Sequence, residues 1–291
     1  MFFVLGLDED FKYNANYIRI ISSTEGSIKF IKGKIAEEIR HENYKDGYIL
    51  LKGLSHIEKN QDVFEKLILV LETLREEDSI FKEEELNILE KAKNVSGYFK
   101  PYYCEAIIKK EDKDYEAALN SINKYLELTG EDSEDIIALR NSILKSLNYE
   151  AGKALIYEDP KTAIKLLLPI LEDNPEDASL YYYIGVSYRV LENFQKSIYY
   201  LTEALNIDNN LVQVVNELGI NYASLGNYDT GISYLRKAFE ATKSIEICTN
   251  LVMCYLNSGK YEEAKDHLAI AKKLNPKDEI VLELEKVISE L

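Results

Sequence analysis

The chain has 291 residues, of which 46% are hydrophobic and 30% are charged, so it carries enough apolar material for a large core. Its 51 Asp and Glu outnumber its 35 Lys and Arg, and the net charge of -16 repels nucleic-acid phosphates and anionic lipid surfaces. Five prolines and 13 glycines are too few for many short strands and tight turns. We therefore expect a helical chain that binds neither nucleic acid nor membrane.

The first seven residues, Met1 to Leu7, are apolar, but no positive segment leads them and the acidic run Asp8-Glu9-Asp10 follows. No window approaches the roughly 18 to 20 apolar residues of a membrane span. We therefore expect no signal peptide and a cytoplasmic protein. Abundant Lys, Ile, Asn, Tyr and Glu indicates an A+T-rich bacterial genome.

A set of small, aromatic and aliphatic residues recurs with a period of 34 and then 33 residues. The three copies are Gly185, Tyr188, Phe194, Leu201 and Ala204; Gly219, Tyr222, Tyr228, Leu235 and Ala238; and Val252, Tyr255, Tyr261, Leu268 and Ala271. Within the first copy, Ile184, Gly185 and Tyr188 stand at i, i+1 and i+4, which marks one face of a helix. Leu201 and Ala204 mark a second helix. Each copy therefore predicts a helical hairpin.

Polar residues before proline mark the boundaries of the copies. Asn174-Pro175 and Asn275-Pro276 are 101 residues apart, which equals three repeats of 34, 34 and 33 residues. A capping side chain before a proline at the first helical position is typical of a helix start, and we expect helices to begin at Pro175 and Pro276. Asp159-Pro160 repeats this pattern upstream. Before it, residues 132–157 predict one long helix.

These residues resemble the tetratricopeptide repeat (TPR) family, most specifically from about Ser179 to Pro276. The family's usual tryptophan position holds Tyr181, Val215 and Cys248. The resemblance implies an all-α fold, a right-handed α-α superhelix or TPR-like solenoid of helical hairpins. It also implies that the first helix of each hairpin lines a concave face, where such proteins bind peptides.

We expect four regions along the chain. They are a degenerate helical-hairpin region at 1–97, divergent TPR-like units at 98–177, three TPR repeats at 178–276 and a C-terminal capping helix at 277–291. In the first region, the segments expected to form two hairpins are 28–43 with 44–58 and 61–77 with 82–95. Residues 1–23 fit a strand or a helix equally.

A partner on the concave face would contact residues at i, i+4 and i+7 of each first helix, and their neighbours. The candidate peptide- or partner-binding residues are Tyr182, Tyr183, Val186, Arg189, Asn216, Glu217, Ile220, Asn250 and Met253. Some members of the family hold a C-terminal carboxylate with lysines, arginine and asparagines. Glu217 stands where that clamp has asparagine. The two asparagines here either bond an extended peptide backbone or only solvate the groove, and both interpretations stay open.

The sequence has no phosphate loop, GxSxG elbow or HExxH motif, and its three cysteines and three histidines are scattered. We therefore expect no catalytic residue, no metal and no cofactor. The sequence predicts a non-catalytic protein- or peptide-binding scaffold. A peptide-responsive bacterial regulator with a TPR groove, and a phosphatase-like regulatory enzyme, remain as alternatives. The partner, the pathway and the oligomeric state are left open.

Overall fold

The computed structural model describes residues 1–290, and this part of the chain is all-α, with 17 helices and no strand. Helices take up 78% of the chain, well above the usual third and as the 3.6-residue periodicity predicts. The chain divides into two compact units, Met1–Leu144 and Lys145–Leu291. Helix α9 (Glu134–Ala154) begins in the first unit and ends in the second. The four sequence regions proposed above stay a prediction.

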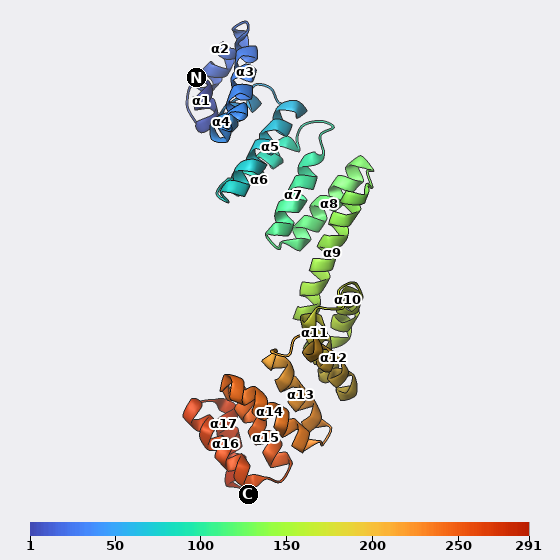
Figure 1. Ribbon diagram of the computed structural model, residues 1–291. Helices are drawn as coiled ribbons and strands as arrows, with labels where there is room; N and C mark the ends of the chain where they lie inside the picture. The colour runs from blue at the N-terminus through green and yellow to red at the C-terminus, as the bar shows by residue number, and fades with distance from the viewer. Residues whose placement is uncertain (291) are drawn as a thin grey trace. The chain divides into compact units, whose positions relative to one another are not determined.

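In the first unit most helices pack against the next helix along the chain (Figure 1), and the first helix packs mainly against the fourth. Before α9 they are α1 (Phe2–Leu7), α2 (Asn14–Ser23), α3 (Ser27–Arg40), α4 (Tyr44–Ser55), α5 (Gln61–Glu77), α6 (Phe81–Ala92), α7 (Lys100–Glu111) and α8 (Tyr115–Thr129). The two hairpins expected between residues 28 and 95 are confirmed as α3 with α4 and α5 with α6. Residues 1–23, which fit strand or helix, form α1 and α2.

Helix α1 has only six residues and is too short to be stable alone, so packing must hold it in place. It crosses α4 at two glycines. A Cβ at Gly6 would stand 1.9 Å from the backbone oxygen of Ile49, and a Cβ at Gly53 would stand 2.9 Å from the backbone oxygen of Phe2. Because the two backbones approach this closely, the apolar start of the chain closes the core of the first unit, with Leu5 buried.

Ion pairs join the segment after α1 to two other helices. Glu9 lies 3.1 Å from Lys52 Nζ on α4 and 2.8 Å from Lys91 Nζ on α6. Lys52 also lies 2.5 Å from Glu84 on α6. Burial raises the pKa of Glu9, but the hydrogen bonds and charges of Lys91 and Lys52 outweigh it and hold this pKa at about 2. Glu9 therefore stays ionised across the physiological range.

The first unit also buries a carboxyl group, Glu85 on α6. Its Oε2 accepts a hydrogen bond of 2.7 Å from Arg75 Nε on α5, while its Oε1 has no hydrogen-bond partner among the described residues. Burial disfavours the charged form and raises the pKa of Glu85 to about 7, although the charge of Arg75 acts in the opposite direction. This carboxyl group therefore titrates near neutral pH.

The stability of the first unit should consequently depend on the protonation of Glu85. Because the folded-state pKa is raised, the stabilisation is complete below the ordinary pKa of about 4.5 and is lost as pH rises through about 7. We expect the free energy of unfolding to fall by on the order of 1 to 2 kcal/mol between pH 5 and pH 8. Urea denaturation at both pH values measures this. Glu85→Gln should reduce the dependence of the free energy of unfolding on pH. Parallel pH profiles for the two proteins would contradict the raised pKa of Glu85.

The second unit contains the remaining eight helices, again packed in chain order (Figure 1). They are α10 (Pro160–Asp173), α11 (Ala178–Val190), α12 (Phe194–Ile207), α13 (Val212–Ser224), α14 (Tyr228–Thr242), α15 (Ile245–Asn257), α16 (Tyr261–Leu274) and α17 (Glu279–Ser289). Three hairpins, α11 with α12, α13 with α14 and α15 with α16, form where each of the three copies predicts a helical hairpin. Helix α17 buries Val281 and Leu284 against the last of them.

The predicted helix starts are partly wrong. Asp159 caps α10 by accepting from Thr162 N, with Pro160 in the first turn, as expected. Pro175 and Pro276, however, lie in turns, and α11 and α17 begin three residues later. Their caps are Asp177 and Asp278, whose carboxylates accept from the first backbone N–H groups. An aspartate two residues after each proline competes for the same role and, being closer to the apolar stripe, sets the start of the helix.

Glycines allow the two helices to cross closely in the first two repeats. A Cβ at Gly219 on α13 would stand 2.6 Å from Leu235 Cγ on α14, and a Cβ at Gly185 would stand 2.8 Å from Leu201 Cγ. Gly152, near the end of α9, has the same relation to Leu167 on α10, at 2.7 Å. Because Gly152 precedes Gly185 by 33 residues, the last turns of α9 with α10 make a fourth copy that the sequence reading did not separate from the long helix.

Candidate partner-binding face

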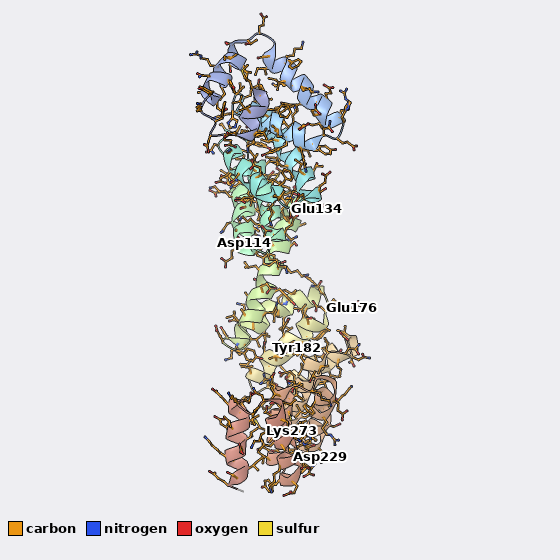
Figure 2. The ribbon with its side chains drawn as sticks, turned by 90° about the vertical axis from the view of Figure 1, so that its left-hand side faces the viewer. Asp114, Glu134, Glu176, Tyr182, Asp229 and Lys273 are labelled. Carbon is orange, nitrogen blue, oxygen red and sulfur yellow. The ribbon has the colours of Figure 1, made fainter. Side chains whose placement is uncertain are left out.

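All nine predicted partner-binding residues lie on α11, α13 and α15, the first helices of the three repeats. We call the surface that these helices present the first-helix face. Tyr182, labelled in Figure 2, belongs to α11. The i, i+4 and i+7 spacing places these residues on one side of each helix because 3.6 residues make one turn. How exposed each side chain is depends on the neighbouring repeat.

An ion pair joins the first two repeats on this face. Arg189 Nε on α11 lies 2.5 Å from Glu217 Oε2 on α13, and both side chains are largely buried. Burial raises the pKa of Glu217 above its ordinary value, although the charge and hydrogen bond of Arg189 act in the opposite direction. Arg189 is the only cation among the predicted residues, and this pair engages it. The face therefore offers little free charge to a partner.

A hydrogen bond between asparagines joins the second and third repeats. Asn250 on α15 donates through Nδ2 to Asn216 Oδ1 on α13, at 3.2 Å. Asn216 is 7% exposed, whereas Asn250 is half-buried. The two amides thus satisfy part of each other's hydrogen-bonding capacity. Only Asn250 retains groups that an approaching peptide can reach.

Val186 does not line the face as predicted. It is 1% exposed and packs with Ile156 and Ala163 in the core between repeats. The i+4 spacing from Tyr182 is right for a shared helix side, but the preceding repeat covers this part of α11. A partner cannot contact Val186 in this conformation. Glu217, at 6% exposed, is nearly as inaccessible.

Two tyrosines form an aromatic cluster at the α11 end of the face. The rings of Tyr182 and Tyr183 are 5.4 Å apart, and Tyr149 of α9 meets Tyr183 edge-on at 6.0 Å. Burial raises the pKa of Tyr182 to about 12, so the hydroxyl is neutral and can donate a hydrogen bond. Both rings pack partly on the core, which gives them a structural role beside any role in binding.

A small pocket of about 160 Å³ opens between α13 and α15. Three predicted residues, Ile220, Asn250 and Met253, contribute to its wall, and Met253 is 47% exposed. The other residues around it are Ala223, Ser224, Leu235, Cys254 and Asn257. Asn257 was not among the predicted site residues. Its position four residues after Met253 was the signal that could have indicated it.

The fold and this face define a class, the repeat proteins built from stacked helical hairpins. Residues 222–287, which run from the end of α13 into α17, match a family model described as tetratricopeptide repeat. Together with the three copies of the repeat in the structure, this match identifies tetratricopeptide repeats in the second unit. No curated protein matches it by sequence.

Several solved structures are similar in fold. YrrB, a TPR protein with an unusual peptide-binding site, has 22% identity, with 64% of this chain and 91% of that chain covered and a TM-score of 0.48. TTC0263, a thermophilic TPR protein of Thermus thermophilus, has 19% identity over 66% of this chain and 98% of that chain, with a TM-score of 0.42. The Cut9-Hcn1 hetero-tetramer of the APC/C has 15% identity over 95% of this chain and 59% of that chain, with a TM-score of 0.47.

Two further observations concern chemistry elsewhere in residues 1–290. None of the described helices combines the length and the apolar composition needed to cross a membrane. All three cysteines are buried, and burial raises the pKa of each thiol, to about 12 for Cys104. The thiolate is the reactive form of cysteine, so these thiols are poor nucleophiles at neutral pH.

Proposed function

We propose that the protein is a non-catalytic scaffold that binds a protein or peptide segment on the first-helix face of its second unit. The observation that carries this proposal is the pocket between α13 and α15. It combines the exposed side chain of Met253 and the half-buried side chain of Ile220 with the free hydrogen-bonding capacity of Asn250. Methionine adapts to different apolar partners, and an amide can both donate to and accept from a peptide backbone.

The internal pairs of the face define the chemistry of the ligand. Because Arg189 and Glu217 neutralise each other, a charged terminus of the partner gains little there. A pocket of about 160 Å³ has room for one aliphatic side chain. We therefore expect the partner to insert one such side chain between α13 and α15 and to place a peptide group against Asn250.

Replacing Asn250 and Met253 together by alanine should weaken partner binding at least about tenfold. The loss combines a hydrogen bond of roughly 0.5 to 1.5 kcal/mol with buried apolar contact, and about 1.4 kcal/mol corresponds to tenfold. Affinity capture from native lysate with the immobilised full chain measures it. Neither side chain belongs to the buried core, so we expect the melting temperature to change by only a few degrees.

The matched control is Asn206→Ala with Leu274→Ala, which removes one exposed amide and one exposed apolar side chain from second helices. This variant should capture the same proteins as the unmodified chain. If the Asn250 and Met253 variant also captures them all, the first-helix face is not the binding surface. Asn216, which the sequence would place in this test, is less suitable because it is buried.

The alternative function, a peptide-responsive regulator, rests on the two polar links between repeats. The Arg189–Glu217 and Asn216–Asn250 pairs each cross from one first helix to the next. A peptide that bonds Asn250 would compete with Asn216 and could alter the spacing of those repeats. Small-angle scattering of the full chain with and without a captured peptide distinguishes the two functions, because a scaffold would keep its profile unchanged.

A further inference from the structure

A larger groove lies in the first unit, between α3 and α5, with α4 as its floor. Its volume is about 600 Å³. We call it the N-terminal groove, and its lining includes Ile35, Arg40, Leu51, Leu54, Lys66 and Leu69. No part of it belongs to the first-helix face, and its function does not depend on the function proposed above.

The floor and the lower walls of the groove are apolar. Leu51 and Leu54 of α4 form the floor, and Ile35 of α3 and Val70 of α5 form the lower walls. At the rim, Leu69 is 61% exposed although it lies between two core positions of α5. A large leucine in water above an apolar floor indicates a surface that gains stability when it is covered.

The charges around the rim favour an acidic occupant. Among the residues that line the groove, the cations Lys32, Arg40 and Lys66 outnumber the one acid, Asp62. Two of these cations are paired, since Lys66 Nζ lies 2.7 Å from Asp62 and Lys32 Nζ lies 2.7 Å from Glu58. Within residues 1–290, Arg40 forms no ion pair. In residues 1–60, nine Lys and Arg balance nine Asp and Glu, so residues 61–291 carry the whole net charge of -16. An acidic segment is therefore repelled by most of the chain and attracted to this rim.

The walls favour a helix over an extended peptide. They are helices whose backbone groups bond within themselves, so the groove has no free N–H or C=O groups to pair with a strand. A helix satisfies its own backbone. The wall from Asp62 to Thr73 spans about 16 Å at roughly 1.5 Å per residue, enough for about three turns. Apolar residues at i, i+3, i+4 and i+7 would reach the floor.

We propose that the N-terminal groove binds an acidic amphipathic helix of a partner protein. Its apolar face covers Leu51, Leu54 and Leu69, and its carboxylates face Arg40 and Lys66. Binding buries apolar surface for affinity, while the cationic rim selects against basic helices.

Fluorescence anisotropy with the full chain and a labelled probe tests the proposal. The probe is a helix-forming peptide of roughly 14 residues with leucine at i, i+3, i+4 and i+7 and glutamate elsewhere. A matched probe carries lysine in place of glutamate. We expect the acidic probe to bind at least about tenfold more tightly than the basic one, and we expect added salt to reduce the difference.

Two variants locate the binding surface. Leu69→Glu should weaken binding of the acidic probe at least about tenfold. Ile80→Glu should leave that binding unchanged, because Ile80 is 74% exposed in the same unit but lies outside the groove. Arg40→Glu should reverse the preference between the two probes. Leu69, Ile80 and Arg40 are all exposed, so we expect each variant to fold, and an unchanged melting temperature verifies this. The Asn250 and Met253 variant should bind the probe normally, which separates this proposal from the function of the second unit.

Three results would overturn the proposal. Equal binding of the acidic and basic probes would show that the rim does not select charge. Binding that Leu69→Glu leaves intact would place the probe elsewhere. A dimer in light scattering that Leu69→Glu converts to a monomer would mean that a second copy of the chain covers the groove.

Discussion

Gly6→Ala is expected to detach α1 from α4 and to lower the free energy of unfolding of the first unit by about 3 kcal/mol. The new methyl group would stand 1.9 Å from the backbone oxygen of Ile49, and a backbone atom cannot move aside as a side-chain tip can. The helices must therefore separate, which exposes Leu5. Urea denaturation measures the loss, and hydrogen exchange of the amides in residues 2–7 should accelerate.

The control is the same change at Gly33, in the middle of α3. No atom lies within 4 Å of a Cβ at Gly33, so alanine meets only solvent there. Because alanine favours a helix over glycine, Gly33→Ala should stabilise the first unit by roughly 0.5 to 1 kcal/mol. If the two alanine variants have the same stability, the close approach of α1 and α4 is not real.

Gly219→Leu should destabilise the second unit by roughly 1 to 3 kcal/mol, the usual cost of overpacking. Gly219 lies where α13 and α14 cross, and its Cβ would stand 2.6 Å from Leu235 Cγ and 3.1 Å from the backbone oxygen of Gly231. Leu235 is buried at this crossing, so its side chain must shift to admit the new one. Thermal unfolding followed by circular dichroism measures the loss.

Gly219→Ala distinguishes crowding from helix propensity. The sequence does not decide the sign of this change, because alanine stabilises a helix by about 1 kcal/mol relative to glycine if there is space for its methyl group. The structure decides against the gain because the space is occupied. We therefore expect the alanine variant to melt between the unmodified protein and the leucine variant. A melting temperature above that of the unmodified protein would mean that α13 and α14 are further apart than described.

The two proposed surfaces differ in the ligand that they would accept. The pocket of the first-helix face is small and largely uncharged, and it suits one side chain and a peptide group. The N-terminal groove is larger, apolar and cationic at its rim, and it suits a helix. If both proposals hold, the protein would bind two different segments, one on each unit.

The repeat and the class of fold follow from the amino-acid sequence alone. Leu235 and Ala238 have counterparts in all three copies, and Gly219 has a glycine counterpart in the first. They recur because each hairpin buries an aliphatic residue where its helices cross, and these contacts lie within about 20 residues of one another. Local spacing therefore identified the hairpins, and the glutamate-rich helix at the end of the chain.

The accessibility of residues on the first helices could not be predicted from the sequence, because it depends on how the repeats pack. Val186 and Met253 both fall on the predicted binding stripe, yet the first is in the core and the second is exposed. Exposure there depends on how closely the neighbouring repeat approaches, which is set by side chains a full repeat away in the sequence. The N-terminal groove was missed for the same reason. Its walls, α3 and α5, are separate in sequence, and no period in the sequence reports the distance between them.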